Sequence, residues 1–157
     1  MRRKLVAYFS ATGVTANVAW KLAAAIGADL YEIKPETPYT AADLNWMDRH
    51  ARSTIEMRDA SSRPRIADHN AAIGNYDVIY LGFPIWWFRA PAIINTFLES
   101  YDFTDKTVAL FATSGGSGFG RTAENLRSSC PGAILKGGKM LNGQMSRQAL
   151  AQWAEGM

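Results

Sequence analysis

Short apolar runs rich in β-branched and aromatic residues alternate along this chain with segments whose apolar residues recur at helical spacing. This alternation is typical of βα units, in which helices join parallel strands and cover the sheet. The runs expected to be strands are residues 5–9, 30–33, 77–83, 108–113 and 133–141. The segments expected to be helical are residues 14–26, 41–59, 91–101, 121–129 and 146–153. No internal repeat or long linker divides the series, so we predict a single α/β domain over residues 1–157.

Composition and charge narrow the class of protein. The 157 residues suit one domain, and 48% hydrophobic with 20% charged residues is a globular composition. No apolar run approaches the roughly 18 residues of a membrane helix. The basic start followed by residues 5–9 superficially resembles a signal peptide, but its apolar part stops at Ser10. We therefore expect a first strand there, a cytoplasmic location, and no membrane or nucleic-acid partner.

Cysteine and histidine give no sign of a metal site. The single cysteine, Cys130, excludes an internal disulfide and a thiolate metal cluster within one chain. It precedes a proline in an expected loop, and we interpret it as a structural thiol. His50 and His69 lack carboxylates at ligand spacing. We expect no metal ion.

The first expected strand runs directly into a loop of small and hydroxyl residues at the start of a helix. The loop consists of Ser10, Ala11, Thr12, Gly13, Val14 and Thr15. Unpaired N–H groups and the helix dipole favour an anion at such an end. The loop has no lysine, so it does not match the Walker loop, and the GxGxxG pattern is absent too. Helix capping is the alternative, but one hydroxyl suffices for a cap, so we predict a site for one phosphate monoester.

Two further loops follow expected core strands, where ligands bind in open parallel sheets. The loop after residues 77–83 contains Pro84, Ile85, Trp86, Trp87 and Phe88. Its rings can stack on a planar ligand, although core or dimer packing would also explain them. The loop after residues 108–113 contains Thr113, Ser114, Gly115, Gly116, Gly118 and Phe119. Its glycines let the backbone approach a flat ligand closely, with a merely flexible loop as the alternative.

Together the three loops resemble the flavin mononucleotide (FMN) site of flavodoxins. The pattern Ser10-x-Thr12-Gly13-x-Thr15 resembles the phosphate loop of that family. The two later loops resemble the segments that flank the isoalloxazine ring in a short-chain subfamily with a Pro-Ile-Trp-Trp loop. Residues 38–46 and the dipeptide at 63–64 are similar to the same subfamily, and the resemblance runs from about residue 4 to residue 141.

The resemblance implies a flavodoxin-like, doubly wound, five-stranded parallel sheet of order 2-1-3-4-5 in three α/β/α layers. It also implies non-covalently bound FMN and electron transfer as the activity. By this resemblance residues 10–15 hold the phosphate, and Trp86, with Trp87 beside it, covers one face of the flavin. Residues 113–119 supply backbone contacts to the pyrimidine edge and the ribityl chain.

Two features depart from the family pattern. Flavodoxins are usually acidic, whereas this chain has a net charge of +3 and five arginines within residues 49–65. Many flavodoxins also place a glycine near the flavin N5, and its peptide flips on one-electron reduction. No glycine lies between Phe83 and Pro91, and a positive φ there would cost about 1 kcal/mol or more. With Arg89 expected beside the flavin, these departures predict two-electron rather than one-electron chemistry.

The residues leave three functions open. An electron carrier or small FMN oxidoreductase leads, since FMN supplies the redox chemistry and no catalytic side chain is evident. An NAD(P)H- or quinone-dependent reductase on the same fold is the second, favoured by the positive charge and the missing glycine. A flavin-free module that binds a protein through its tryptophan loop is the third. The expected partner is a redox protein or a small electron donor or acceptor, and the chain is expected to be a monomer or weak homodimer.

Overall fold

The computed structural model describes residues 3–114, 122–141 and 146–157, and it contains one sheet of five parallel strands. The strands lie in the order β2-β1-β3-β4-β5, and every neighbouring pair is parallel. Their bounds are β1 (Lys4–Tyr8), β2 (Asp29–Glu32), β3 (Val78–Pro84), β4 (Thr107–Thr113) and β5 (Ile134–Met140). The predicted doubly wound sheet and its strand order are confirmed.

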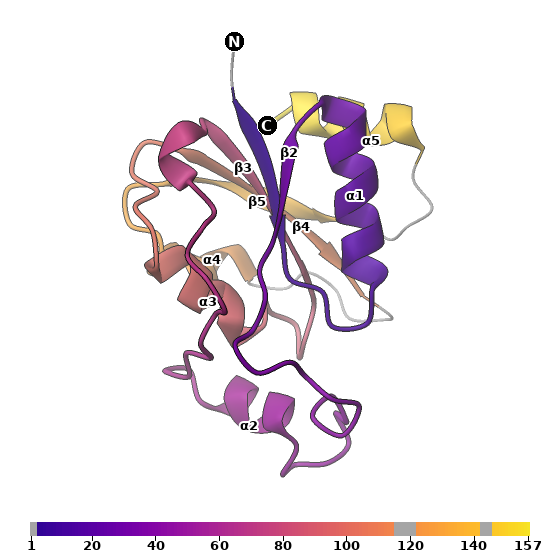
Figure 1. Cartoon of the computed structure of the whole chain (residues 1–157), viewed down its shortest axis with the longest axis vertical. Helices are drawn as coiled ribbons and strands as arrows, with labels where there is room; N and C mark the ends of the chain where they lie inside the picture. Colours follow the sequence, from indigo (N-terminus) through magenta and orange to yellow (C-terminus); the bar gives the residue numbers. More distant parts are fainter. Residues whose placement is uncertain (1–2, 115–121, 142–145) are drawn as a thin grey trace.

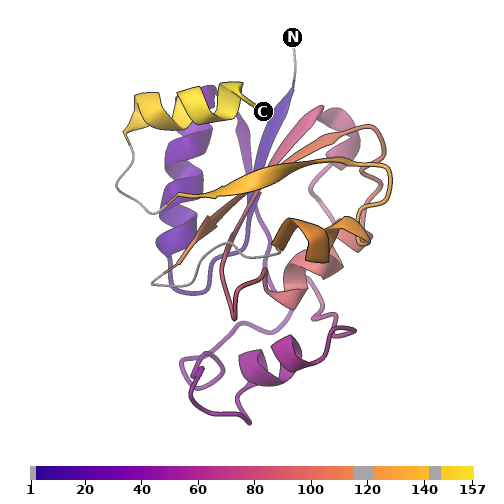
Figure 2. The same ribbon diagram turned by 180° about the vertical axis from the view of Figure 1, so that it is seen from behind.

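Two pairs of helices cover the sheet (Figures 1 and 2). Helices α1 (Val14–Ile26) and α5 (Arg147–Glu155) pack on one face through residues such as Leu22 and Leu150. Helices α3 (Ala92–Glu99) and α4 (Thr122–Arg127) pack on the other through residues such as Phe97 and Leu126. The result is the expected three-layer arrangement. No helix in the described ranges is long and apolar enough to cross a membrane.

The two central strands are buried from both sides. All seven residues of β4 and six of the seven in β3 are buried, as expected for parallel strands covered on both faces. Gly82 of β3 pairs with Phe111 of β4, and a Cβ at Gly82 would lie 2.2 Å from the Phe111 ring. A glycine is therefore required where the ring crosses the neighbouring strand. By contrast, β2 lies at the sheet edge and is largely exposed.

The chain between β2 and β3 leaves the sheet and extends beyond the carboxyl ends of the strands (Figures 1 and 2). We call residues 34–75 the long connection; it contains α2 (Arg52–Arg58) and the 3₁₀ turn η1 (Ile73–Asn75). Its base is closed by hydrogen bonds from Glu36 N–H to the Arg65 carbonyl (2.8 Å) and from Ala67 N–H to the Lys34 carbonyl (2.7 Å).

The predicted helix over residues 41–59 was wrong in its first half. Short polar side chains there accept hydrogen bonds from nearby backbone N–H groups: Asn45 from Met47 and Asp48 from His50. Such bonds compete with the helical ladder, and Met47, which the apolar spacing would bury, is 75% exposed. The other predicted elements differ from the observed ones by at most two residues at either end.

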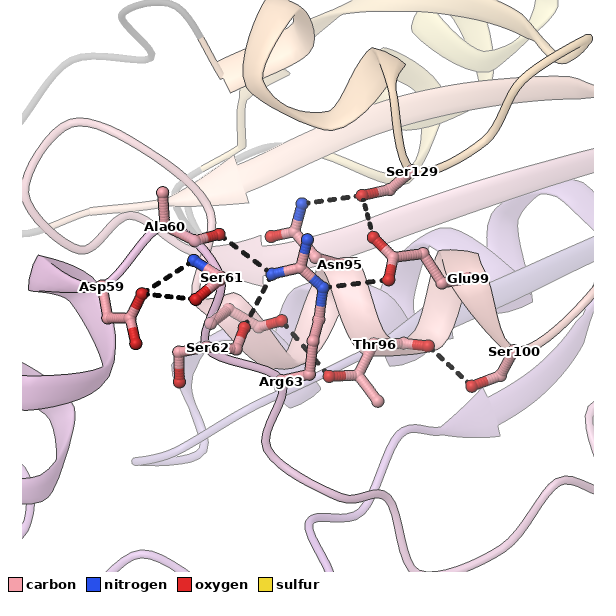
Figure 3. Close-up of polar contacts among 11 residues, drawn as sticks. Asp59, Ala60, Ser61, Ser62, Arg63, Asn95, Thr96, Glu99, Ser100 and Ser129 are labelled. Atoms are coloured by element: carbon pink, nitrogen blue, oxygen red, sulfur yellow. Dashed lines mark hydrogen bonds and ion pairs between the residues drawn. The ribbon is translucent and has the colours of Figure 1, made fainter.

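A polar network attaches the far end of the long connection to α3 (Figure 3). Arg63 Nε lies 2.9 Å from Glu99 Oε1, and Ser129 Oγ donates to Glu99 Oε2 at 2.7 Å. Asn95 Nδ2 in turn donates to Ser129 Oγ at 2.9 Å. The adjacent Cys130 is buried, and burial raises the pKa of its thiol, which agrees with a structural role.

Candidate functional site

The three loops identified in the sequence meet at the carboxyl edge of the sheet. Hydrogen bonds continue beyond the strand ends, from Phe9 N–H to the Gly82 carbonyl (3.0 Å) and from Ile85 N–H to the Thr113 carbonyl (2.9 Å). Thr15 Oγ1 and Thr113 Oγ1 form a buried hydrogen bond of 2.8 Å. The first turn of α1 is thereby fixed to the end of β4.

The first loop presents the start of α1 to solvent. Gly13 adopts a left-handed conformation (φ 93°) at the N-cap, and its N–H donates to Ser10 Oγ at 3.1 Å. Because a glycine cap has no side chain, it leaves the first-turn N–H groups available to an external acceptor. Thr12 and Gly13 are exposed, whereas Thr15 is buried and its hydroxyl is bonded to Thr113. The loop therefore offers mainly backbone donors and the hydroxyls of Ser10 and Thr12.

The second loop contains a tight hairpin turn made of aromatic residues. Trp86 and Arg89 bond each other through both backbone pairs, at 2.9 and 3.2 Å. The two central residues, Trp87 and Phe88, have φ of 50° and 65°, and positive φ at both positions is the mark of a type I′ turn. Bulky residues pay about 1–2 kcal/mol each for this conformation, and such strain is concentrated at functional sites.

This turn changes one expectation from the sequence. From the sequence we expected this glycine-free loop to adopt positive φ only after reduction of a bound flavin, at a cost in conformational free energy. Instead, Trp87 and Phe88 already have positive φ in this structure. The missing glycine therefore no longer supports two-electron chemistry.

Trp86 is held by other rings, one of which is bonded to α2. Its ring centroid lies 5.7 Å from that of Phe9 and 5.5 Å from that of Tyr39, both edge-on. Arg52 stacks on the Tyr39 ring at 3.9 Å and pairs with Glu56 at 2.9 Å. The Tyr39 hydroxyl donates to Glu56, and burial, followed by this hydrogen bond, raises the pKa of Tyr39. The long connection thus fixes the orientation of Trp86.

A cavity of about 700 Å³ lies between these loops and the long connection. Seven of its lining residues were predicted from the sequence: Ala11, Thr12, Pro84, Ile85, Trp86, Trp87 and Ser114. Sequence reasoning missed Leu44, Trp46 and Ser53, and it named Phe88 among the rings of the second loop without assigning it to the cofactor. The similarity over residues 38–46 was a usable signal for the first two, but no role was assigned to it. Gly115, Gly116, Gly118 and Phe119 lie outside the described residues, so their predicted contacts stay predictions.

Comparison with known proteins identifies the family. The model of the family described as Flavodoxin matches residues 3–157. The chain belongs to the flavodoxin family. No curated protein matches it.

Similar solved structures agree with this assignment. A protein assigned as a flavoprotein from Bacteroides eggerthii is 48% identical, with a TM-score of 0.93 over 99% of this chain and 97% of that one. A second, from Bacteroides uniformis, is 49% identical, with a TM-score of 0.91 over 98% of each chain. A flavoprotein from Lactobacillus acidophilus, solved in complex with FMN, is 24% identical, with a TM-score of 0.70 over 89% of this chain and 93% of that one. The last similarity concerns the fold alone.

Arg89 of this flavodoxin does not point into the cavity, contrary to expectation. Its guanidinium donates to the Met57 carbonyl at 2.6 Å, near the C-terminal end of α2, where helix carbonyls attract a cation. Arg89 is not among the residues that line the cavity, and none of the described lining residues is charged. The argument that Arg89 would favour an anionic reduced flavin therefore loses its structural basis.

Proposed function

We propose that this flavodoxin-family protein binds FMN non-covalently in the cavity and passes electrons between a donor and an acceptor, with the flavin as the redox centre. One observation carries the proposal. The exposed N-terminus of α1 and an aromatic cavity lie at the same edge of the sheet, and both of their loops are attached to Thr113, by the Thr15–Thr113 hydroxyl bond and by the bond from Ile85 N–H to the Thr113 carbonyl. A ligand with a phosphate at one end and a flat ring at the other matches this combination.

The donor set of the site suits FMN at both ends. Backbone N–H groups and the hydroxyls of Ser10 and Thr12 can solvate one phosphate without a lysine. At the other end, Trp86 and Trp87 border a cavity of about 700 Å³, which falls within the roughly 300–1,000 Å³ of ordinary ligand sites. The residues present therefore fit the cofactor.

In this proposal the chain binds and orients, and FMN supplies the redox chemistry when bound. The Phe9–Tyr39–Trp86 cluster keeps Trp86 in one orientation against the ring. No acid–base pair is needed for electron transfer, and we assign no catalytic residue.

The phosphate contact provides the sharpest test. Thr12→Asp places a carboxylate beside the phosphate, and like charges a few ångströms apart repel by about 4 kcal/mol at an intermediate dielectric. Because Thr12 is exposed and solvent screens part of this repulsion, we expect the dissociation constant of FMN to rise by roughly 100-fold, which corresponds to about 2.7 kcal/mol, while that of riboflavin, which lacks the phosphate, changes little. Titration of the apoprotein with each flavin, followed by fluorescence quenching, measures both constants.

Ser128→Asp is the control, because it adds the same charge at an exposed position beyond α4. It should leave both flavin constants unchanged. Equal weakening of FMN and riboflavin by Thr12→Asp would contradict the phosphate assignment. A purified protein that binds no flavin would favour the flavin-free binding module instead.

A second candidate function is the direct reduction of small molecules. The cavity has a wall, from Leu44 to Ser53, that the three flavin-binding loops do not supply. We propose a small donor or acceptor, or a redox protein, as the partner, and a cytoplasmic location and a monomer or weak homodimer remain our predictions. Anaerobic addition of NADPH to the FMN-loaded protein, before dithionite, distinguishes a reductase from a carrier by whether the flavin absorbance bleaches.

A further inference from the structure

The turn over residues 86–89 has a backbone conformation that its own residues disfavour. Trp87 and Phe88 have φ of 50° and 65°, at turn positions where asparagine and glycine are the usual residues. Both residues line the cavity. Bulky residues keep positive φ only where the surrounding structure imposes it. Contacts from outside the turn are therefore needed to keep it from relaxing.

The sheet fixes the start of this turn. Ile85, the residue before it, donates from its N–H to the Thr113 carbonyl at 2.9 Å. Trp86 closes the turn through its two backbone hydrogen bonds with Arg89, and its ring packs edge-on against two other aromatic rings. None of these contacts involves the two residues with positive φ.

The end of the turn leads into α3 and is attached to α2 by one side chain. Arg89 is half-buried, and its guanidinium donates to the Met57 carbonyl at 2.6 Å. Met57 is the second-to-last residue of α2, so its carbonyl is one of the four at the helix end that have no partner within the helix. A guanidinium suits this position because the helix dipole attracts a cation there and a charged donor makes a strong hydrogen bond.

This bond is the polar link between the turn and the long connection. Among the residues that the structure describes, residues 86–89 make no other side-chain hydrogen bond and no ion pair. If the bond were lost, one pair of backbone hydrogen bonds would have to hold two bulky residues at positive φ.

We propose that Arg89 is a positioning residue for the ring end of the cofactor site. Its bond to Met57 keeps the turn in the positive-φ form, and that form places Trp87 and Phe88 at the cavity, where they border the flavin ring. The inference rests on the proposed function for the identity of the ligand. The bond itself acts on the protein with or without flavin, and Arg89 has this role without facing the cavity.

Amide hydrogen exchange in the apoprotein tests the anchor without any flavin. The N–H groups at positions 86 and 89 close the turn, so their exchange rates report whether it is formed. Arg89→Met removes the donor, and we expect both rates to rise by roughly tenfold while the amides of β3 stay protected. Arg89→Lys keeps a charged donor and should restore most of the protection. Arg58→Met, the matched control at an exposed position on the same helix, should leave both rates unchanged.

Flavin titration measures the consequence for binding. Arg89→Met should raise the dissociation constants of FMN and of riboflavin by the same factor, about tenfold, because both ligands contain the ring. Arg89→Lys should recover most of the affinity, and Arg58→Met should match the wild type. Weakening of FMN alone would contradict a role at the ring end.

A double-mutant cycle separates positioning of the turn from a general structural role. Phe88→Gly removes the cost of positive φ at one of the two positions, so the turn depends less on Arg89. Although Phe88→Gly has its own effect on binding, Arg89→Met in that background should change the riboflavin constant by only about twofold. The full factor in both backgrounds would overturn the role of Arg89, as would wild-type exchange rates in Arg89→Met.

Failure of this inference is distinguishable from failure of the proposed function. A wild-type protein that binds no FMN would overturn the proposed function, and exchange in the apoprotein would still decide whether Arg89 holds the turn. FMN binding that is equal in the wild type and Arg89→Met would overturn the positioning role alone.

Discussion

In the sheet, all seven residues of β4 and six of the seven in β3 are buried, and helices pack against both faces. In the long connection, only seven residues form α2, and a few buried residues, Ile66 and Ile73 among them, are supplemented by the hydrogen bonds and ion pairs of side chains such as Arg52. Burial is shared among many residues, so the loss of one contact leaves the rest in place. The long connection has fewer buried residues than the sheet, so each of its polar networks carries a larger share of its local stability. Substitutions in the sheet should therefore lower global stability, and substitutions in the long connection should loosen the site locally.

The largest loss of stability is expected for a substitution in the sheet at a position with no space for an added side chain. In Gly82→Ala the added Cβ would meet the Phe111 ring at 2.2 Å, so the strand or the ring must shift. Overpacking of this kind costs about 1–3 kcal/mol. Gly74→Ala is the control in the long connection, because nothing lies within 4 Å of a Cβ there. Urea denaturation should show a clear loss of unfolding free energy for Gly82→Ala and a change within about 0.5 kcal/mol for Gly74→Ala; equal stabilities would contradict the comparison.

A smaller, local effect is expected from Arg52→Met. The substitution removes the cation over the Tyr39 ring, the pair with Glu56 and the hydrogen bond to the Thr37 carbonyl. We expect a loss of about 1 kcal/mol, confined to the long connection. Hydrogen exchange should accelerate for amides of residues 39–57 and stay slow in β3 and β4.

Arg58→Met is the control for charge, since Arg58 is exposed at the end of the same helix. It should leave the exchange rates of residues 39–57 unchanged. Accelerated exchange throughout the sheet in Arg52→Met would contradict a local role. Unchanged exchange near Tyr39 would show that the ring cluster holds α2 without the arginine.

The contrast between the sheet and the long connection also explains which features could be predicted from the sequence. The strands and α1 could be located because apolar runs and the Gly27 stop are local signals, and Gly27 indeed has a φ of 66° at the end of α1. The signal for the phosphate loop was equally local, because its residues are consecutive in the sequence. The helix predicted over residues 41–51 does not form, because side-chain hydrogen bonds to the backbone outweigh the apolar spacing. Hydrophobic periodicity carries no information about such bonds. Ser53 and Trp46 were missed as cavity residues because the path of the long connection brings them there, and Arg89 was misplaced because its partner is the Met57 carbonyl.

The smallest effect is expected at the outer attachment of the long connection. The Arg63 and Glu99 side chains are 35% and 41% exposed, so solvent screens their attraction, and exposed pairs of this kind contribute roughly 0.2–1 kcal/mol. A double-mutant cycle of Arg63→Gln and Glu99→Gln at pH 7 should give a coupling of about 0.5 kcal/mol. Urea denaturation of the wild type, both single variants and the double variant measures it.

The pH dependence of this coupling follows from the direction of the Glu99 shift. The hydrogen bond from Arg63 is the main cause that lowers the pKa of Glu99, and Ser129 adds to it. A carboxylate whose pKa is lowered by folding contributes stability above its unfolded pKa of about 4.3 and loses that contribution as the pH falls through the folded value. The coupling should therefore be full at pH 7 and absent once Glu99 is protonated, and 1 M salt should reduce it at pH 7. A coupling above about 2 kcal/mol, or one that persists after protonation, would show that this exposed contact stabilises the long connection as strongly as burial stabilises the sheet.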